Sequence, residues 1–112
     1  MEDRRMFARI TLNVPLKFMD VHTGVEGVGE TVDLSANGVG FISAENKPIL
    51  STGVGLEMWL NIPDQHEPLY VKGTVIWTKA TPEGKKQRVG VSLEREELLH
   101  LARILWVKNK AR

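Results

Sequence analysis

Apolar and polar side chains alternate along several short stretches of this chain. Between residues 10 and 18, apolar side chains at every second position alternate with Thr11, Asn13, Pro15 and Lys17, and a period of two is typical of a half-buried strand. Because proline lacks an N–H group, we expect an edge or a bulge at Pro15. Further stretches of the same kind predict strands over residues 28–33, 39–44, 54–62, 70–78 and 89–93.

The penultimate predicted strand carries a tryptophan among its apolar positions. Val71, Gly73, Val75 and Trp77 share one face by alternation. We therefore expect Trp77 in the core rather than stacked against a ligand. Trp59 falls on the outward face of the preceding strand. Three roles stay open for Trp59: packing beneath a helix, contact with a partner, or a tolerated exposed position.

The pattern changes after the last strand. Leu98, Leu101, Ala102 and Leu105 follow helical spacing, with glutamates before them and basic residues after them, as the helix dipole favours. The sequence therefore predicts one helix, over about residues 94–108. Strands followed by a single helix predict an all-β fold with a C-terminal helix, built as a small antiparallel barrel or sandwich. No helical pattern separates the strands, which argues against a parallel α/β sheet.

The composition narrows the possible functions. A chain of 112 residues fits one domain, and the absence of cysteine excludes disulfides and thiolate metal sites. A net charge of +1 is too small for a general polyanion binder. Apolar runs are far shorter than a membrane span and the N-terminus lacks a hydrophobic signal region, so we expect a cytoplasmic protein without membrane contact. Three scattered histidines and the lack of an acid–base arrangement predict no metal, no cofactor and no catalysis.

Two polar motifs stand out against this background. Arg4, Arg5 and Arg9 lie in the stretch "RRMFAR", just before the first predicted strand. The planar fork of an arginine binds phosphate oxygens and also matches the O6 and N7 atoms of guanine. We expect residues 1–9 to form a flexible basic arm, because they have little to pack against. The second motif, "DLSANG" over residues 33–38, contains an asparagine and a glycine that tolerate left-handed backbone conformations.

Together these motifs resemble the ligand-binding signature of the PilZ domain family. That signature is RxxxR near the N-terminus and [D/N]xSxxG about two strands later, and this chain reads "RMFAR" and "DLSANG". The stretches "GTVIWT" and "RVGVSLEREELLHLARIL" resemble the family's last two strands and closing helix, although Leu93 stands where the family often has an aromatic residue. The resemblance implies a six-stranded antiparallel barrel with a C-terminal helix over residues 10–112. It also implies a ligand, the bacterial second messenger cyclic di-GMP.

The resemblance further implies which residues bind cyclic di-GMP, namely Arg4, Arg5, Arg9, Asp33, Ser35, Asn37 and Gly38. We expect Arg5 and Arg9 to contact phosphate or guanine edges. Arg4 would stack on or pair with a second guanine, which is compatible with an intercalated ligand dimer. Asp33 would accept hydrogen bonds from guanine N1–H and N2–H₂ or hold one of the arginines. Ser35 would offer a hydroxyl and an accessible backbone amide.

The sequence thus predicts a single-domain, non-enzymatic receptor for cyclic di-GMP that acts as an adaptor. Ligand binding would fold the basic arm over the barrel and change the surface seen by a protein partner. The alternative is a PilZ-like protein-interaction module that does not bind nucleotide, and the complete motifs argue against it. The near-neutral charge disfavours a nucleic-acid-binding barrel. Monomer and homodimer both stay open.

Overall fold

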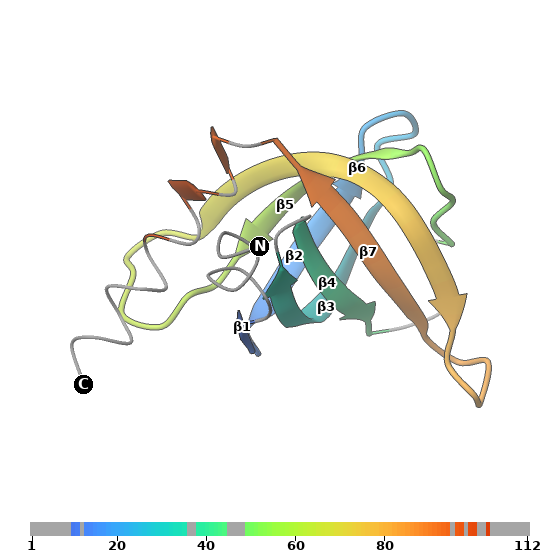
Figure 1. Cartoon of the computed structure of the whole chain (residues 1–112). Coiled ribbons are helices and arrows are strands. Elements are labelled where there is room, and N and C mark those ends of the chain that lie inside the picture. Colours follow the sequence, from blue (N-terminus) through green and yellow to red (C-terminus); the bar gives the residue numbers. More distant parts are fainter. Residues whose placement is uncertain are drawn as a thin grey trace, which may run out of the picture.

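The computed structural model has seven strands within the residues that it describes (Figure 1). The residues described are 10–11, 13–35, 38–44, 49–94, 96–97, 99–100 and 103. The strands are β1 (Ile10–Thr11), β2 (Pro15–Asp20), β3 (Glu26–Ser35), β4 (Gly38–Ser43), β5 (Gly55–Leu60), β6 (Leu69–Ala80) and β7 (Gln87–Leu93).

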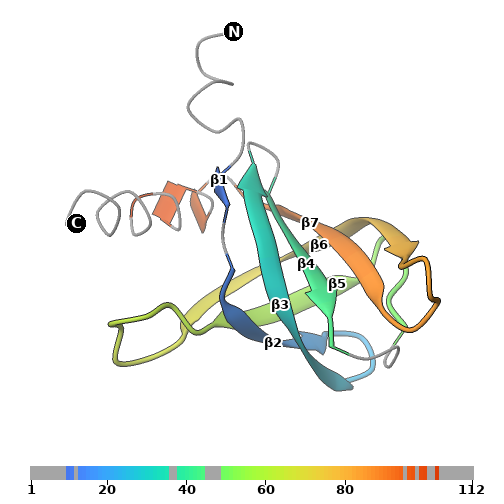
Figure 2. The same cartoon turned by 90° about the horizontal axis from the view of Figure 1, so that it is seen from below.

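The strands form one closed antiparallel barrel. Six of them follow the order β3-β2-β5-β6-β7-β4, and β4 pairs back with β3 to close the ring (Figure 2). The short β1 pairs with β3 beyond the end of β2. Closure pairs each of these six strands on both sides, so the ring itself offers no open edge to another chain. The predicted six-stranded antiparallel barrel is therefore confirmed.

The predicted strand over residues 10–18 is divided into β1 and β2, so a single continuous strand was wrong. The chain leaves the ladder at Val14, whose N–H donates to Oγ1 of Thr31 at 2.9 Å. The N–H of Thr31 donates in return to the Val14 carbonyl at 2.9 Å. The next strand begins at Pro15 rather than bulging there, because the first position of a strand tolerates a missing N–H.

Apolar side chains from every strand of the ring fill the barrel. In β5, Leu56, Met58 and Leu60 are fully buried, which confirms the alternation predicted for residues 54–62. The rings of Phe18 and Phe41 meet with their centroids 5.2 Å apart. The buried core consists of Val14, Leu16, Phe18, Leu34, Val39, Phe41, Leu50, Leu56, Met58, Leu60, Ile62, Val71, Val75, Val89, Val91 and Leu93.

One prediction about the core was wrong, because β6 contains a bulge. Val75 pairs with Val91 and Trp77 pairs with Gly90, so Ile76 is an extra residue on β6. An extra residue reverses the alternation beyond it. Val75 is therefore fully buried, whereas Trp77 points outward with 43% of its surface exposed. Trp77 lies outside the core that its spacing had predicted.

The segment after β7 is described only in part. Glu96, Glu97, Leu99 and His100 have helical backbone conformation. The Lys72 N–H donates to Oε1 of Glu97 at 2.8 Å, which ties this segment to β6. Most of the predicted helix lies outside the described residues, so that helix stays a prediction. Among the residues described, no helix has the length and apolar character to cross a membrane.

Candidate functional site

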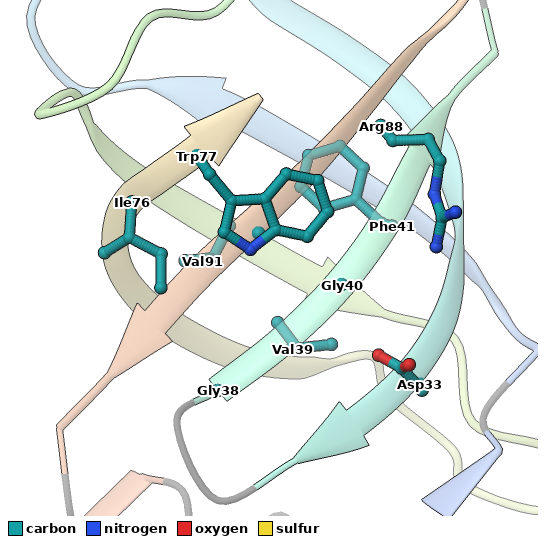
Figure 3. Close-up of a pocket in the computed structure, with 10 residues that line it drawn as sticks. Asp33, Gly38, Val39, Gly40, Phe41, Ile76, Trp77, Arg88 and Val91 are labelled. Carbon is teal, nitrogen blue, oxygen red and sulfur yellow. The ribbon is translucent and has the colours of Figure 1, made fainter. Parts of the chain in front are cut away.

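A recess opens on the outer surface of the barrel, over the wall formed by β3, β4, β7 and β6 (Figure 3). Its volume is about 200 Å³. The lining residues are Asp33, Gly38, Val39, Gly40, Phe41, Ile76, Trp77, Arg88, Gly90 and Val91. Two pairs of strands that are distant in sequence, β3 with β4 and β6 with β7, thus contribute to one recess.

The floor of the recess is made of backbone. Gly40 of β4 stands directly opposite Gly90 of β7, and neither carries a side chain. A Cβ added to Gly90 would collide with Nε1 and Cε2 of Trp77, so the indole lies closely over this glycine. A Cβ added to Gly40 would come within 3.1 Å of Oδ1 of Asp33. The two glycines therefore give room to the side chains that lean over them.

Two bulges position Asp33 and Trp77, the side chains that stand on either side of the recess. In β3, Thr31 pairs with Phe41 and Asp33 pairs with Gly40, so Val32 is an extra residue. In β6, Ile76 is the extra residue, and Trp77 follows it. Because a bulge re-aims the residues that follow it, Asp33 and Trp77 both end in the register row of the two glycines. Figure 3 shows the indole over β7 and the carboxylate on the far side of β4.

The turn that joins β3 to β4 borders the recess at Gly38. Its φ is +151°, and a Cβ there would collide with the carbonyl oxygen of Val91 on β7. Both the backbone conformation and the close approach of β7 therefore require glycine at this position. Ser35 pairs with Gly38 through the ladder, which closes the turn.

The recess combines a planar ring with groups of both charges. The Trp77 indole offers a stacking face, Asp33 offers acceptors, and Arg88 offers a fork of donors at the end farther from Gly38 (Figure 3). A flat heterocycle can lie on an exposed indole and hydrogen-bond to a carboxylate at its edge. A guanidinium can hold a phosphate or the acceptor edge of a guanine. This set of groups suits a planar, hydrogen-bonding, anionic ligand.

The structure brings together part of the residue set that the motifs predicted. Asp33 and Gly38 line the recess, and the backbone of Ser35 lies at the turn beside them. The other members of the set lie outside the described residues: Arg4, Arg5, Arg9 and Asn37.

Sequence reasoning missed the two side chains of the recess that could stack on a ligand or donate a charge-assisted hydrogen bond to it, Trp77 and Arg88. Val75, Ile76 and Trp77 are three consecutive bulky apolar residues. Such a run breaks the alternation of a half-buried strand, so it was an available signal of a bulge.

The opposite wall of the barrel carries large side chains at every position of its central row. Lys17, Trp59 and Tyr70 are direct partners across β2, β5 and β6. The ammonium of Lys17 lies 5.5 Å from the centre of the Trp59 ring, and the Trp59 and Tyr70 rings lie 5.5 Å apart. Partial burial and, after it, the carboxylate of Glu57 raise the pKa of Tyr70 above its usual value. These side chains pack on one another along the sheet.

Comparison with known proteins adds a family and a set of similar structures. A family model described as the PilZ domain matches residues 3–110. The PilZ domain with c-di-GMP of YcgR from Escherichia coli is 18% identical, with 97% of this chain and 95% of that chain covered and a TM-score of 0.71. The PilZ domain of CeSA from a cellulose-synthesizing bacterium is 17% identical over 87% of this chain and 96% of that one, with a TM-score of 0.59.

A third similar structure is longer than this chain. It is the inhibitor of motility MotI/DgrA from Bacillus subtilis, which is 14% identical with a TM-score of 0.63. The alignment covers 97% of this chain but only 52% of that one. No curated protein matches the chain in sequence. At these identities the three structures establish a shared fold.

Proposed function

We propose that this chain, which belongs to the PilZ domain family, is a receptor that binds cyclic di-GMP in the recess between Asp33 and Trp77. The observation that carries the proposal is the row Asp33–Gly40–Gly90–Trp77, in which two bulges aim an acceptor and an indole over a floor of bare backbone. The similar PilZ domain of YcgR, whose structure contains c-di-GMP, supports the identity of the ligand.

The recess suits a guanine base. The row spans three strand spacings, about 14 Å, which leaves room for a base between its two ends. The base would stack on the Trp77 indole, and Asp33 would accept hydrogen bonds from guanine N1–H and N2–H₂. Arg88 would donate to guanine O6 and N7 or to a phosphate. Gly40 and Gly90 let the base approach the sheet closely.

The two phosphates of the ligand need more cations than the recess itself presents. We propose that Arg4, Arg5 and Arg9 supply them, as the motif resemblance implies. Replacing Arg5 or Arg9 by alanine should weaken binding by about 1.5–3 kcal/mol each, as expected for charge-assisted hydrogen bonds. The arginines precede the barrel strands that build the core, so these substitutions should leave thermal unfolding of the free protein almost unchanged.

We also propose that the receptor is an adaptor, which passes the ligand state to a protein partner. Closure of residues 1–9 over the recess would change the surface that the partner meets. We further propose a bacterial, cytoplasmic setting and a C-terminal helix over residues 94–108. The ligand would bind either alone or as an intercalated dimer. The rival function is a PilZ-like interaction module that does not bind nucleotide.

Calorimetric titration of the full chain separates the two functions. Cyclic di-GMP should give a saturable binding isotherm whose molar ratio reports one or two ligands per chain. Cyclic di-AMP is the matched control, because it has the same charge and lacks the guanine groups that Asp33 and Arg88 would bind. An absence of heat with both dinucleotides would favour the interaction module, and equal affinities would contradict the roles given to Asp33 and Arg88.

A further inference from the structure

The hairpin that joins β6 to β7 is strongly basic and extends away from the barrel (Figure 1). Residues 79–88 contain four cations, Lys79, Lys85, Lys86 and Arg88, and one carboxylate, Glu83, which gives a local charge of +3. The whole chain carries +1. The hairpin is therefore a local concentration of positive charge in a chain whose total charge is nearly balanced.

The turn of this hairpin has a fixed shape. The N–H of Thr81 donates to the Lys86 carbonyl at 2.9 Å, and the N–H of Lys86 donates to Oγ1 of Thr81 at 3.1 Å. The N–H of Gly84 donates to the Thr81 carbonyl at 2.7 Å. The pKa of Glu83 is lowered mainly by a hydrogen bond between its carboxylate and its own backbone, and to a smaller extent by a hydrogen bond with the Thr81 hydroxyl. The Glu83 carboxylate thus bonds within the turn, and Lys85 and Lys86 are exposed beside it.

Below the turn, two like charges face each other. Lys79 and Arg88 are direct partners across β6 and β7, and like charges at such positions destabilise a sheet. Within the described part of the chain, no carboxylate forms an ion pair with either residue. An anion bound between them would relieve the repulsion.

A second recess lies beside this pair. It has a volume of about 520 Å³ and is lined by Ile42, Thr81, Pro82, Glu83, Lys85, Lys86 and Arg88. Ile42 and Pro82 give it an apolar part, and Lys85, Lys86 and Arg88 give it positive charge. Arg88 also lines the proposed ligand site, so one guanidinium borders both recesses.

We propose that this hairpin is the docking site for an acidic segment of a protein partner. Carboxylates of the segment would pair with Lys85, Lys86 and the Lys79–Arg88 pair, and an apolar side chain would enter the recess beside Ile42. A membrane fits less well, because none of the exposed large apolar side chains lies within residues 79–88 to enter a bilayer. Duplex nucleic acid fits less well, because typical complexes use about six to ten phosphate contacts.

Because Arg88 borders both recesses, binding of cyclic di-GMP should affect binding of the acidic segment, an inference that rests on the proposed function. Cyclic di-GMP carries two negative charges and would bind on the other side of Arg88. It would weaken the attraction of the hairpin for an acidic segment, and the segment would weaken ligand binding by the same factor. We expect a two- to fivefold effect, roughly, at low ionic strength, and a smaller one at high salt.

The test uses a fluorescein-labelled peptide of glutamates with two leucines, titrated with the full chain and followed by anisotropy. The double variant Lys85→Glu/Lys86→Glu should weaken peptide binding at least about tenfold. The matched control, Lys17→Glu/Lys72→Glu, changes the net charge equally on the opposite wall and should weaken it less than about twofold. A peptide with glutamine in place of glutamate should not bind.

Several outcomes would overturn the docking site. They are equal losses in both double variants, no binding of the glutamate peptide, or tighter binding to anionic phosphatidylglycerol vesicles or to a duplex oligonucleotide. Saturating cyclic di-GMP that leaves the peptide affinity unchanged would overturn the coupling through Arg88. The two proposals fail separately: loss of cyclic di-GMP binding with peptide docking intact removes only the proposed function, and the reverse removes only the docking site.

Discussion

Two walls of the same barrel each carry an outward tryptophan, and the two tryptophans have different surroundings. On the wall of β4 and β7, Trp77 leans over Gly90, and the next position in the row is Gly40. On the wall of β2 and β5, Trp59 is flanked by Lys17 and Tyr70, which pack against it from both sides. The row that contains Trp77 has two glycines, whereas the row that contains Trp59 has a large side chain on either side of the indole.

This difference shows how a sheet surface becomes a binding site. In a row of large side chains, neighbouring side chains contact one another, as Lys17 and Tyr70 contact the Trp59 ring, and these contacts leave less of the ring for a ligand. A row with two central glycines leaves backbone and one face of an indole available to a ligand. The bulges add the second requirement, because they aim Asp33 and Trp77 toward the gap.

The largest expected effect comes from filling the turn at the edge of the recess. Gly38→Ala would place a Cβ against the Val91 carbonyl at a φ of +151°. We expect the free energy of unfolding to fall by roughly 2–4 kcal/mol, from strain and displacement of β7. Gly53→Ala is the control, because Gly53 also has a positive φ but open space around it, and it should cost only about 1 kcal/mol. Denaturant unfolding measures both, and equal losses would contradict the packing role of Gly38.

Replacing each tryptophan by alanine in turn tests the difference between the two walls. Trp77→Ala should weaken cyclic di-GMP binding about tenfold to a hundredfold, the usual value of base–aromatic stacking. Trp59→Ala should leave that affinity unchanged and lower the free energy of unfolding by about 1–2 kcal/mol, because its contacts with Lys17 and Tyr70 are lost. Calorimetry and denaturant unfolding measure the two effects. Loss of ligand affinity in Trp59→Ala with no loss in Trp77→Ala would reverse the roles of the walls.

A smaller effect is expected when the floor of the recess is filled. Gly90→Ala would push the indole of Trp77 aside, so the affinity for cyclic di-GMP should fall about fivefold, or ~1 kcal/mol. In the Trp77→Ala background the same substitution should change the affinity less than about twofold, because the group it displaces is absent. A double-mutant cycle by calorimetry measures the coupling, and additive losses would argue that the methyl group acts on the ligand directly.

The smallest effect belongs to the filled wall. Glu57→Gln removes the negative charge that, after burial, raises the pKa of Tyr70. The pKa of Tyr70 should therefore decrease toward its usual value without reaching it, because burial remains. Tyr70 is the single tyrosine of the chain, so an ultraviolet titration reports it alone. An unchanged pKa would show that Glu57 does not contact the hydroxyl in solution.

The barrel could be predicted from the sequence because alternation reports which face of a strand is buried. Leu56, Met58 and Leu60 follow that rule without interruption. Alternation fails where a strand gains a residue, and it therefore placed Trp77 on the wrong face. The extra residue is defined by the partner strand, because Ile76 is a bulge only when Val75 and Trp77 are matched to β7.

The candidate site was predictable only where its residues are close in sequence. The motif over residues 33–38 identified Asp33 and Gly38, which line the recess. Gly40 and Gly90 were not singled out, because the role of each depends on a side chain that leans over it from another strand. The parts played by Arg4, Arg5 and Arg9 stay predictions.

The most direct test of the account uses the ¹⁵N-labelled 112-residue chain and follows the indole N–H signals of its three tryptophans during titration with cyclic di-GMP. The account predicts a large, saturable shift for Trp77 and almost none for Trp59, with assignments made from Trp77→Phe and Trp59→Phe. A shift of the Trp59 signal with an unmoved Trp77 signal would place the ligand on the wrong wall and contradict the central claim.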